Sequence, residues 1–307
     1  MEESGKQILI WNSGTQEKVR YDGNRIPIGK SDSLQIELFL PHCHSPLPDF
    51  LNSIFISLAF SLHPKLLSSV LISLFVPCFV DQLYPNVAWS VVSVLEGLGH
   101  EVDFPEGQSC CGQPPFNSGY WDEARSAARV TMKAFRDAEV VVGPSGSCVT
   151  MIKVFYPDLF KGEPDELEAR ELAAKTHEFS SFLVNVLGVT DVGAKFDGKV
   201  TFHDGCHGLR ELGIKSEPRA LLAKVKGLEL IEMCEAETCC GFGGTFAVKY
   251  SPISTAMDEV KCASILETGA GTVVSNDSSC LMQIRGMLEK EKSGVRSLHL
   301  AEILASK

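Results

Sequence analysis

Short apolar runs alternate with longer amphipathic stretches along the chain from Leu71 onward. Short apolar runs that end in loop residues are typical of buried strands, whereas apolar positions three or four residues apart indicate helices. This pattern predicts strands at 71–76, 101–104, 139–142, 200–203, 228–233 and 272–275, and helices at 85–98, 120–137, 163–187, 217–226 and 254–267. The regular alternation of strands and helices predicts an α/β fold with parallel strands and flanking helices.

The order of these predicted elements occurs twice, before and after a segment at 188–198 that contains several Gly and Asp residues. An internal repeat of this kind predicts two copies of one structural unit, and a length of 307 residues also favours two domains. We therefore expect a first cysteine-rich domain at 70–190 and a second, pseudo-repeated one at 196–307. An atypical N-terminal extension at 1–69 precedes them.

Residues 1–69 combine a polar start, a His- and Pro-rich turn around Cys43 and an apolar run without clear periodicity. The longest apolar stretch, 51–80, is interrupted by His-Pro-Lys at 63–65, which leaves two pieces shorter than the ~20 residues of a membrane-spanning helix. The polar first residues also differ from a signal peptide. We expect no membrane span and a cytoplasmic location; a transit sequence is the alternative, because 41–69 is rich in Ser and poor in acidic residues.

The formal net charge of −11, from 39 acidic and 28 basic residues, narrows the range of partners. A nucleic-acid-binding protein needs clustered Lys and Arg to displace the counterions of the phosphate backbone. The charge balance therefore predicts that nucleic acid is not a partner.

Eight of the 11 cysteines recur at matching positions in the two repeats. They are Cys78, Cys110, Cys111 and Cys148 in the first repeat, and Cys206, Cys239, Cys240 and Cys280 in the second. The first and last cysteine of each set follow predicted strands, and ligands of α/β folds gather beyond the carboxyl ends of strands. The four cysteines of each set are therefore predicted to converge.

Four converging thiolates in a reducing compartment indicate a metal site more often than a disulfide network. Adjacent cysteines are expected to point away from each other, which favours a cluster several ångströms across over a compact ion. Thiolate is a soft ligand that suits iron–sulfur clusters, and Gly112 and Gly241 would let backbone amides approach cluster sulfurs. Structural zinc, thiol–disulfide redox chemistry and inert buried thiols remain as alternatives, although zinc sites use more closely spaced cysteines.

Several phrases around these cysteines resemble a known family. They are 104–114 (FPEGQSCCGQP), 116–120 (FNSGY), 144–148 (PSGSC), 203–207 (HDGCH), 210–213 (RELG) and 239–246 (CCGFGGTF). They are similar to the cysteine-rich CCG domain that occurs twice in one subunit of heterodisulfide reductase, in glycolate oxidase iron–sulfur subunits and, with the most specific match, in the lactate utilization protein A family. The resemblance extends from about residue 72 to the C-terminus.

The resemblance implies an iron–sulfur oxidoreductase subunit, not necessarily active alone, that transfers electrons in the oxidation of L-lactate to pyruvate. It implies up to two iron–sulfur clusters of the [4Fe-4S] type, with iron bound by the eight cysteines above, and two partner subunits of the lactate utilization protein B and C types. A cluster-based thiol–disulfide reductase subunit of the heterodisulfide type and a non-catalytic, zinc-stabilised scaffold are the alternative functions.

The chain departs from the family pattern in two respects. The reductase motif ends in Cys-x-x-Cys, whereas Ser145 and Asp277 stand at the first of these positions here, so each set has four cysteines instead of five. A non-cubane cluster, an ordinary four-iron cubane and a site completed by another ligand all remain open. Family members also begin near the first strand, yet no methionine lies between Met1 and Met132. Residues 1–69 are thus expected to result from an incorrectly assigned gene start, with a genuine extension or a targeting segment as alternatives.

Candidate catalytic residues surround Cys206. His203 and His207 are candidate proton donors, because imidazole titrates near neutral pH; a histidine held by a backbone carbonyl at a strand end is the alternative. Arg210 is a candidate ligand for a carboxylate such as lactate, with a surface ion pair to Glu211 or nearby acids as the alternative. Asp204 is expected to be a cap or turn residue.

Three cysteines lie outside the repeat. Cys262 is predicted to be a core residue of a helix. Cys234 is a candidate spare ligand, because it is close to Cys239 in sequence. Cys43 belongs to the atypical N-terminal segment.

Overall fold

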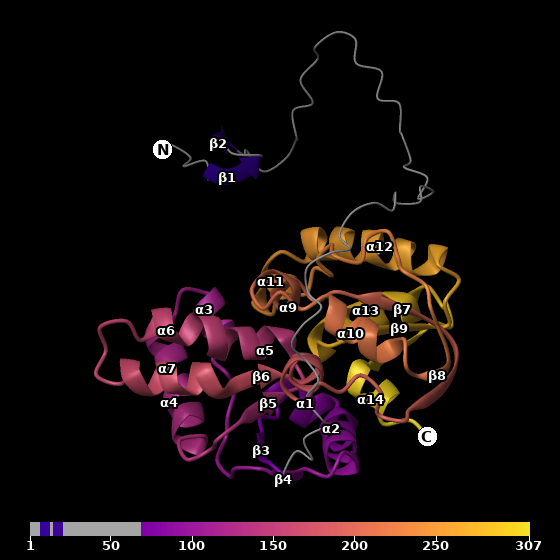
Figure 1. Cartoon of the computed structure of the whole chain (residues 1–307). Coiled ribbons are helices and arrows are strands. Elements are labelled where there is room, and N and C mark those ends of the chain that lie inside the picture. The colour runs from indigo at the N-terminus through magenta and orange to yellow at the C-terminus, as the bar shows by residue number, and fades with distance from the viewer. Residues whose placement is uncertain (1–6, 13–14, 21–68) are drawn as a thin grey trace, which may run out of the picture. The chain divides into compact units, whose positions relative to one another are not determined.

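The computed structural model describes residues 7–12, 15–20 and 69–307 (Figure 1). The chain divides into two compact units, Met1–Ser53 and Ile54–Lys307. The described part of the first unit is an antiparallel hairpin of β1 (Gln7–Asn12) and β2 (Thr15–Arg20), which the apolar pattern did not predict. The expectations for the turn around Cys43 and for the apolar run up to residue 68 fall outside the described residues.

The first repeat contains a four-stranded parallel sheet with the order β4-β3-β5-β6. Its strands are β3 (Leu71–Leu74), β4 (Glu101–Asp103), β5 (Val141–Gly143) and β6 (Thr176–Glu178). All three residues of β5 are buried, as expected for a central strand that is covered on both faces.

The second repeat contains a parallel sheet with the order β10-β9-β7-β8. Its strands are β7 (Lys195–His203), β8 (Lys226–Leu230), β9 (Thr272–Ser275) and β10 (Arg296–His299). In both sheets the first strand of the repeat lies between the second and the third, and the fourth lies beyond the third. The predicted α/β fold with two pseudo-repeated parallel sheets is confirmed.

Helices flank both sheets (Figure 1). In the first repeat they are α1 (Cys78–Leu83), α2 (Pro85–Gly97), α3 (Gln113–Asn117), α4 (Trp121–Ala134), α5 (Gly146–Thr150), the π-helix η1 (Met151–Phe155), α6 (Tyr156–Leu159), α7 (Glu166–Lys175), α8 (Phe179–Ser181) and the π-helix η2 (Phe182–Val186). In the second they are α9 (Cys206–Arg210), α10 (Ser216–Leu222), α11 (Thr245–Lys249), α12 (Ser251–Glu267), α13 (Ser278–Lys290) and α14 (Leu300–Leu304). Within the described part of the chain, no helix combines the length and the apolar character that crossing a membrane requires.

The predicted helix at 163–187 is wrong, because α7 ends at Lys175 and β6 follows directly. Thr176 and Glu178 are buried, and β6 pairs in parallel with β5. The Thr176 hydroxyl donates to the Leu172 carbonyl at 2.7 Å, so it satisfies an acceptor at the end of the helix. Pairing with a strand more than thirty residues away overrides a local pattern that reads as helical throughout.

The start of the second repeat also differs from the prediction. Strand β7 begins at Lys195, inside the segment that was expected to be a linker, and the Lys226 amide donates to the Ala194 carbonyl at 3.0 Å. This pairing starts β8 at Lys226 and leaves α10 shorter than the predicted helix at 217–226. Strand β10 and α14 were not predicted, because a run of four residues with a single apolar side chain, Leu298, gives little periodic signal.

The two repeats share a hydrophobic core, and helices of one repeat pack on helices of the other. The largest cluster of buried residues contains Ile72 and Val91 from the first repeat together with Phe202 and Leu300 from the second. Helix α14 packs on α2, and at the equivalent place α10 packs on α8. Likewise α9, which begins at Cys206, packs on α5, while α1 contacts α13. The helix that begins with the first cysteine of each repeat therefore contacts the helix that carries the last cysteine of the other.

Candidate metal centre

The cysteines of both sets lie just beyond the carboxyl ends of the strands. Cys78 and Cys206 begin α1 and α9, which follow β3 and β7. Cys148 lies in α5 after β5, and Cys280 lies in α13 after β9. The two Cys-Cys pairs lie in the loops that follow β4 and β8. Parallel strands bring all of these positions to one edge of each sheet.

In the first set the thiols form a continuous chain of contacts. The Cys110 sulfur accepts hydrogen bonds from the thiols of Cys111 and Cys78, and these contacts lower the pKa of Cys110 to about 3. The same contacts raise the pKa values of Cys78 and Cys111, and Cys111 also contacts the thiol of Cys148. These shifts favour the thiolate form of Cys110, and thiolate is the form of cysteine that binds metals.

The second set repeats this arrangement. The pKa of Cys239 is lowered to about 2 by hydrogen bonds from the thiols of Cys206 and Cys240. Cys240 has a raised pKa, first because of its contact with Cys239 and then because of its contact with Cys280. The order of thiols along the chain of contacts is the same in both sets.

A left-handed glycine after each pair allows the two adjacent thiols to meet. Gly112 has φ +83° and Gly241 has φ +86°. A Cβ atom would lie 2.9 Å from the Ala124 carbonyl oxygen at Gly112 and 2.5 Å from the Ser254 carbonyl oxygen at Gly241. The glycine amides donate to the sulfurs of Cys110 and Cys239 at 3.5 and 3.4 Å. The expectation that adjacent cysteines point apart is therefore wrong: the turn directs both thiols to one side.

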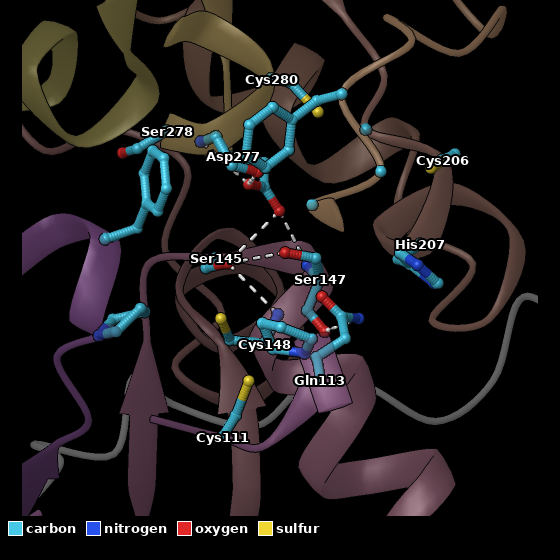
Figure 2. A pocket seen from close by; sticks show the side chains of 18 of the residues that line it. Cys111, Gln113, Ser145, Ser147, Cys148, Cys206, His207, Asp277, Ser278 and Cys280 are labelled. Carbon is cyan, nitrogen blue, oxygen red and sulfur yellow. Dashed lines mark hydrogen bonds between the residues drawn. The ribbon is translucent and has the colours of Figure 1, made fainter. Parts of the chain in front are cut away.

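All eight repeat cysteines line a single cavity of about 160 Å³. In Figure 2, Cys111 and Cys148 lie on one side of Asp277, and Cys206 and Cys280 lie on the other. A single water needs only ~10–15 Å³, so the cavity has room for far more than one ion. The sequence indicated two converging sets, but it did not indicate that they would face each other.

The two repeats are joined across this cavity through Asp277. Its buried carboxylate accepts hydrogen bonds from the Ser147 amide at 2.9 Å and from the Ser145 hydroxyl at 3.3 Å (Figure 2). It also accepts from the amide and the hydroxyl of Ser279 at the start of α13. Ser145 in turn accepts from the Cys148 amide and caps α5. The two residues that replace cysteine in the family pattern thus cap the helices that carry Cys148 and Cys280.

The histidines near Cys206 have different surroundings. His207 lines the cavity, and its Nδ1 atom lies 3.3 Å from a carboxylate oxygen of Glu211. His203 is fully buried, and its pKa is lowered to about 3 by burial and by the charge of Lys261. A ring nitrogen of His203 and the sulfurs of Cys240 and Cys280 all lie within 4.8 Å of one another.

Arg210 and Asp204 lie off the cavity. Arg210 is exposed, and among the described residues no carboxylate lies within the 4.0 Å of an ion pair with it; Glu211 faces His207 instead. Asp204 is not a simple cap or turn residue, because its buried carboxylate pairs with Arg219 through two hydrogen bonds of 2.8 Å. Sequence reasoning missed Arg219, and no local signal marks it as the partner of a residue before Cys206.

The remaining described cysteines are outside the cavity lining. Cys262 is buried in α12 within the core, as predicted. Cys234 is exposed and is not among the residues that line the cavity.

The residues present fit a thiolate-bound metal ion or cluster. Eight soft sulfur ligands face one space, one thiolate is held in each set, and glycine amides already donate to two of the sulfurs. Backbone donors of this kind are what an anionic cluster needs around its sulfurs. The site can therefore bind a metal ion or a cluster.

Comparison with known proteins places these features in a family. A sequence model of the cysteine-rich domain (CCG) family matches residues 72–153 and 200–285. Lactate utilization protein A of Geobacillus thermodenitrificans is 50% identical over 234 residues, which cover 76% of this chain and 98% of that protein. The protein of the same name from Bacillus subtilis is 48% identical over 237 residues, 77% of this chain and 99% of that one.

One solved structure shares the fold. The crystal structure of a hypothetical protein from Helicobacter pylori superposes with a TM-score of 0.54 at 12% sequence identity. The match covers 76% of this chain and 48% of the other, so this chain spans about half of the Helicobacter protein.

Proposed function

Because the chain belongs to the lactate utilization protein A family, whose members carry the cysteine-rich CCG domain, we propose that it is the iron–sulfur subunit of a lactate-oxidising complex. In this role it accepts electrons released when L-lactate becomes pyruvate and passes them onward. The observation that carries the proposal is the single cavity lined by eight thiols in two equivalent chains.

The charge of the cavity supports an electron carrier over a lactate-binding enzyme. Among the described residues that line it there is no Arg or Lys, and Asp277 adds a buried carboxylate. A carboxylate substrate is normally held by a guanidinium or an ammonium group, so an anion such as lactate would meet uncompensated negative charge here. Lactate is therefore bound and oxidised on a partner subunit, and this chain receives only the electrons.

The residues in and around the cavity have distinct parts in this role. The eight cysteines hold the clusters, which when bound supply reversible one-electron chemistry. The Gly112 and Gly241 amides donate to sulfur and stabilise its negative charge. The Phe79 and Phe242 rings, 5.5 Å apart in an edge-to-face arrangement, give the cavity an apolar part of its lining. Asp277 and Ser145 keep the two repeats in register.

The partners in this proposal are two proteins of the lactate utilization B and C types, and the place of action is the cytoplasm. Each cluster is of the [4Fe-4S] type with four cysteine ligands, because the fifth cysteine position of each set is occupied by a helix cap that is already hydrogen-bonded.

The test begins with anaerobically purified protein. We expect brown protein with iron and acid-labile sulfide in about equal amounts and an electron paramagnetic resonance signal after reduction. L-Lactate should reduce the clusters only when both partner subunits are present. Colourless protein that carries zinc would support a structural scaffold instead, and reduction by lactate in the absence of partners would show that this chain binds the substrate itself.

Thiol–disulfide reduction is the second candidate, and one observation favours it. Cys78 is exposed, although it lines the cavity, so an external disulfide can reach this thiol. In that case a disulfide substrate would perturb the spectrum of the reduced cluster in the isolated chain. The proposed electron carrier would show no such change.

A further inference from the structure

The two thiol sets have matching backbone donors but different side chains behind the sulfurs. His203 stands three residues before Cys206, where the first repeat has Phe75 three residues before Cys78. Lys261 stands 21 residues after Cys240, where the first repeat has Met132 at the same interval after Cys111. All four side chains are buried. Two apolar groups of the first repeat are thus replaced by an imidazole and an ammonium group in the second.

His203 approaches the second set from outside the cavity. It is not among the residues that line the cavity, yet a ring nitrogen lies within 4.8 Å of the sulfurs of Cys240 and Cys280. Neither ring nitrogen makes a well-directed hydrogen bond within the described residues, although the Ala236 carbonyl is close enough to act on the pKa of the ring. A buried polar group without a partner destabilises the folded state, so its retention calls for an explanation.

A neutral imidazole offers one N–H donor, and sulfur is the acceptor in reach. Whichever tautomer is present, one of its two ring nitrogens carries the N–H. The Ala236 carbonyl already accepts from the Asp204 amide at 3.0 Å and from the Lys261 ammonium at 3.3 Å. Because that carbonyl is shared with other donors, the sulfurs of Cys240 and Cys280 are the further acceptors within reach of the His203 ring.

Lys261 lies buried beside the same sulfurs; burial lowers its pKa, and the nearby Cys240 and Cys280 favour its charged form. Its ammonium group donates to the carbonyls of Glu235 and Ala236, which hold it in place, and it interacts electrostatically with Cys240 and Cys280. The first repeat has no equivalent among the described residues. There the buried hydroxyl of Tyr156 donates to the Cys111 carbonyl at 2.8 Å and is not directed at sulfur.

We propose that His203 and Lys261 raise the reduction potential of the second centre above that of the first. The inference rests on the proposed function, since it needs a cluster in each set. Hydrogen bonds to sulfur and nearby positive charge stabilise the reduced, more negative state of a cluster. An electron that enters at the first centre then passes to the second, which is reduced as the first is oxidised. His203 is a positioning residue, because it acts through the sulfur atoms.

A redox titration of the anaerobic full-length protein, followed by electron paramagnetic resonance, tests this directly. Wild-type protein should show two midpoints. In His203→Phe, which copies the first repeat, only the higher midpoint should fall. We expect at least a tenfold drop in the ratio of reduced to oxidised second centre at the wild-type midpoint, which corresponds to ~59 mV for one electron.

Matched variants separate a donor effect from a loss of structure. His203→Gln keeps an N–H donor and should restore most of the potential, and Lys261→Met should lower the same midpoint. Phe75→His, the converse substitution, should raise the lower midpoint. Iron content and circular dichroism confirm that each variant is loaded and folded.

Three results would overturn the inference in distinguishable ways. Protein without iron would overturn the proposed function and this inference together. Two clusters whose midpoints do not respond to His203→Phe would overturn the inference alone. Loss of half of the iron in both His203→Phe and His203→Gln would show that His203 is a ligand, not a donor to sulfur.

Discussion

The two thiol sets have the same frame but different surroundings. In both, a left-handed glycine turns an adjacent pair of cysteines toward one side, and a middle thiolate accepts from two neighbouring thiols. Around this frame the side chains differ. Two residues before the first cysteine of the set, the first repeat has Val76 and the second has Asp204. Thirteen residues after that cysteine, the first repeat has Val91 and the second has Arg219. The frame of the thiol sets has been kept, whereas the side chains around it have diverged.

The lining of the shared cavity shows the same divergence. Phe79 follows Cys78 and His207 follows Cys206, while Gln113 and Phe242 stand two residues after the Cys-Cys pairs. All four side chains line the cavity, and the Phe79 and Phe242 rings are in edge-to-face contact. At each of these two equivalent positions, one repeat therefore has a phenyl ring and the other a polar side chain, a difference that a strictly symmetric dimer could not have.

The largest expected effect comes from removing the central thiolate of either set. If each set holds its own cluster, as we propose, Cys110→Ser and Cys239→Ser should each lose about half of the iron, and the double variant should lose all of it. Iron and acid-labile sulfide analysis of anaerobic protein measures this. If either single substitution removed all of the iron, the two sets would form one shared centre, and the comparison between them would no longer hold.

The ion pair between Asp204 and Arg219, two positions that are valines in the first repeat, gives the next prediction. Arg219→Val leaves the buried Asp204 carboxylate without its main partner, so the free energy of unfolding should fall by about 3–5 kcal/mol in urea denaturation. The double variant Asp204→Val/Arg219→Val copies Val76 and Val91 of the first repeat. It should recover most of this loss, because an apolar pair of similar shape needs no compensating charge. Equal losses in the single and double variants would contradict this explanation.

The residues that end the fourth strands should give opposite pH dependences. Glu178 ends β6 and caps α8, and burial raises its pKa to about 7. His299 ends β10 and caps α14, and burial lowers its pKa to about 4. Because of Glu178, the free energy of unfolding should therefore fall as the pH rises from 4.5 to 7, since this carboxyl ionises at a lower pH in the unfolded chain than in the folded one. Because of His299, the free energy of unfolding should fall as the pH drops from 6.5 to 4, since this imidazole is protonated at a higher pH in the unfolded chain than in the folded one.

Each of these two effects is at most about 3 kcal/mol. The variant Glu178→Gln should remove only the loss of stability that occurs as the pH rises from 4.5 to 7. The variant His299→Asn, which keeps a capping side chain, should remove only the loss that occurs as the pH falls from 6.5 to 4. Urea denaturation at a series of pH values checks both. Identical pH profiles for wild type and either variant would show that the buried group does not titrate on unfolding.

The smallest effect concerns the two glycine turns. Gly112→Ala and Gly241→Ala should each lower the free energy of unfolding by about 1–3 kcal/mol, because the alanine must adopt a left-handed backbone conformation. The second should cost more, because its Cβ would approach a backbone oxygen more closely, at 2.5 Å instead of 2.9 Å. Thermal unfolding compares the two variants, with Gly286→Ala, a helical position with open space around it, as the control. A larger loss for Gly112→Ala would contradict this order and show that the approach of the Cβ atom to the backbone oxygen does not set the cost.

The spacing of the cysteines and the periodicity of the apolar residues were sufficient to predict the fold class and the candidate ligands. Strand β9 was predicted at its observed bounds, 272–275, and α12 ends at Glu267 as expected. These features depend on local pattern: a short buried run forms a strand, and a cysteine just after it lies at the sheet edge. A sequence reports such relations directly, because they join residues that are neighbours in the chain.

Tertiary structure alone decided how the parts meet. Strand β6 forms where the local pattern reads as helix, because β5 offers an unpaired edge. Asp277 reaches Ser145 and Ser147 of the other repeat, and Arg219 reaches Asp204, through contacts that no periodicity encodes. The convergence of both thiol sets on one cavity likewise follows from packing between repeats. Sequence spacing determines which groups are available, and long-range burial determines which of them come together.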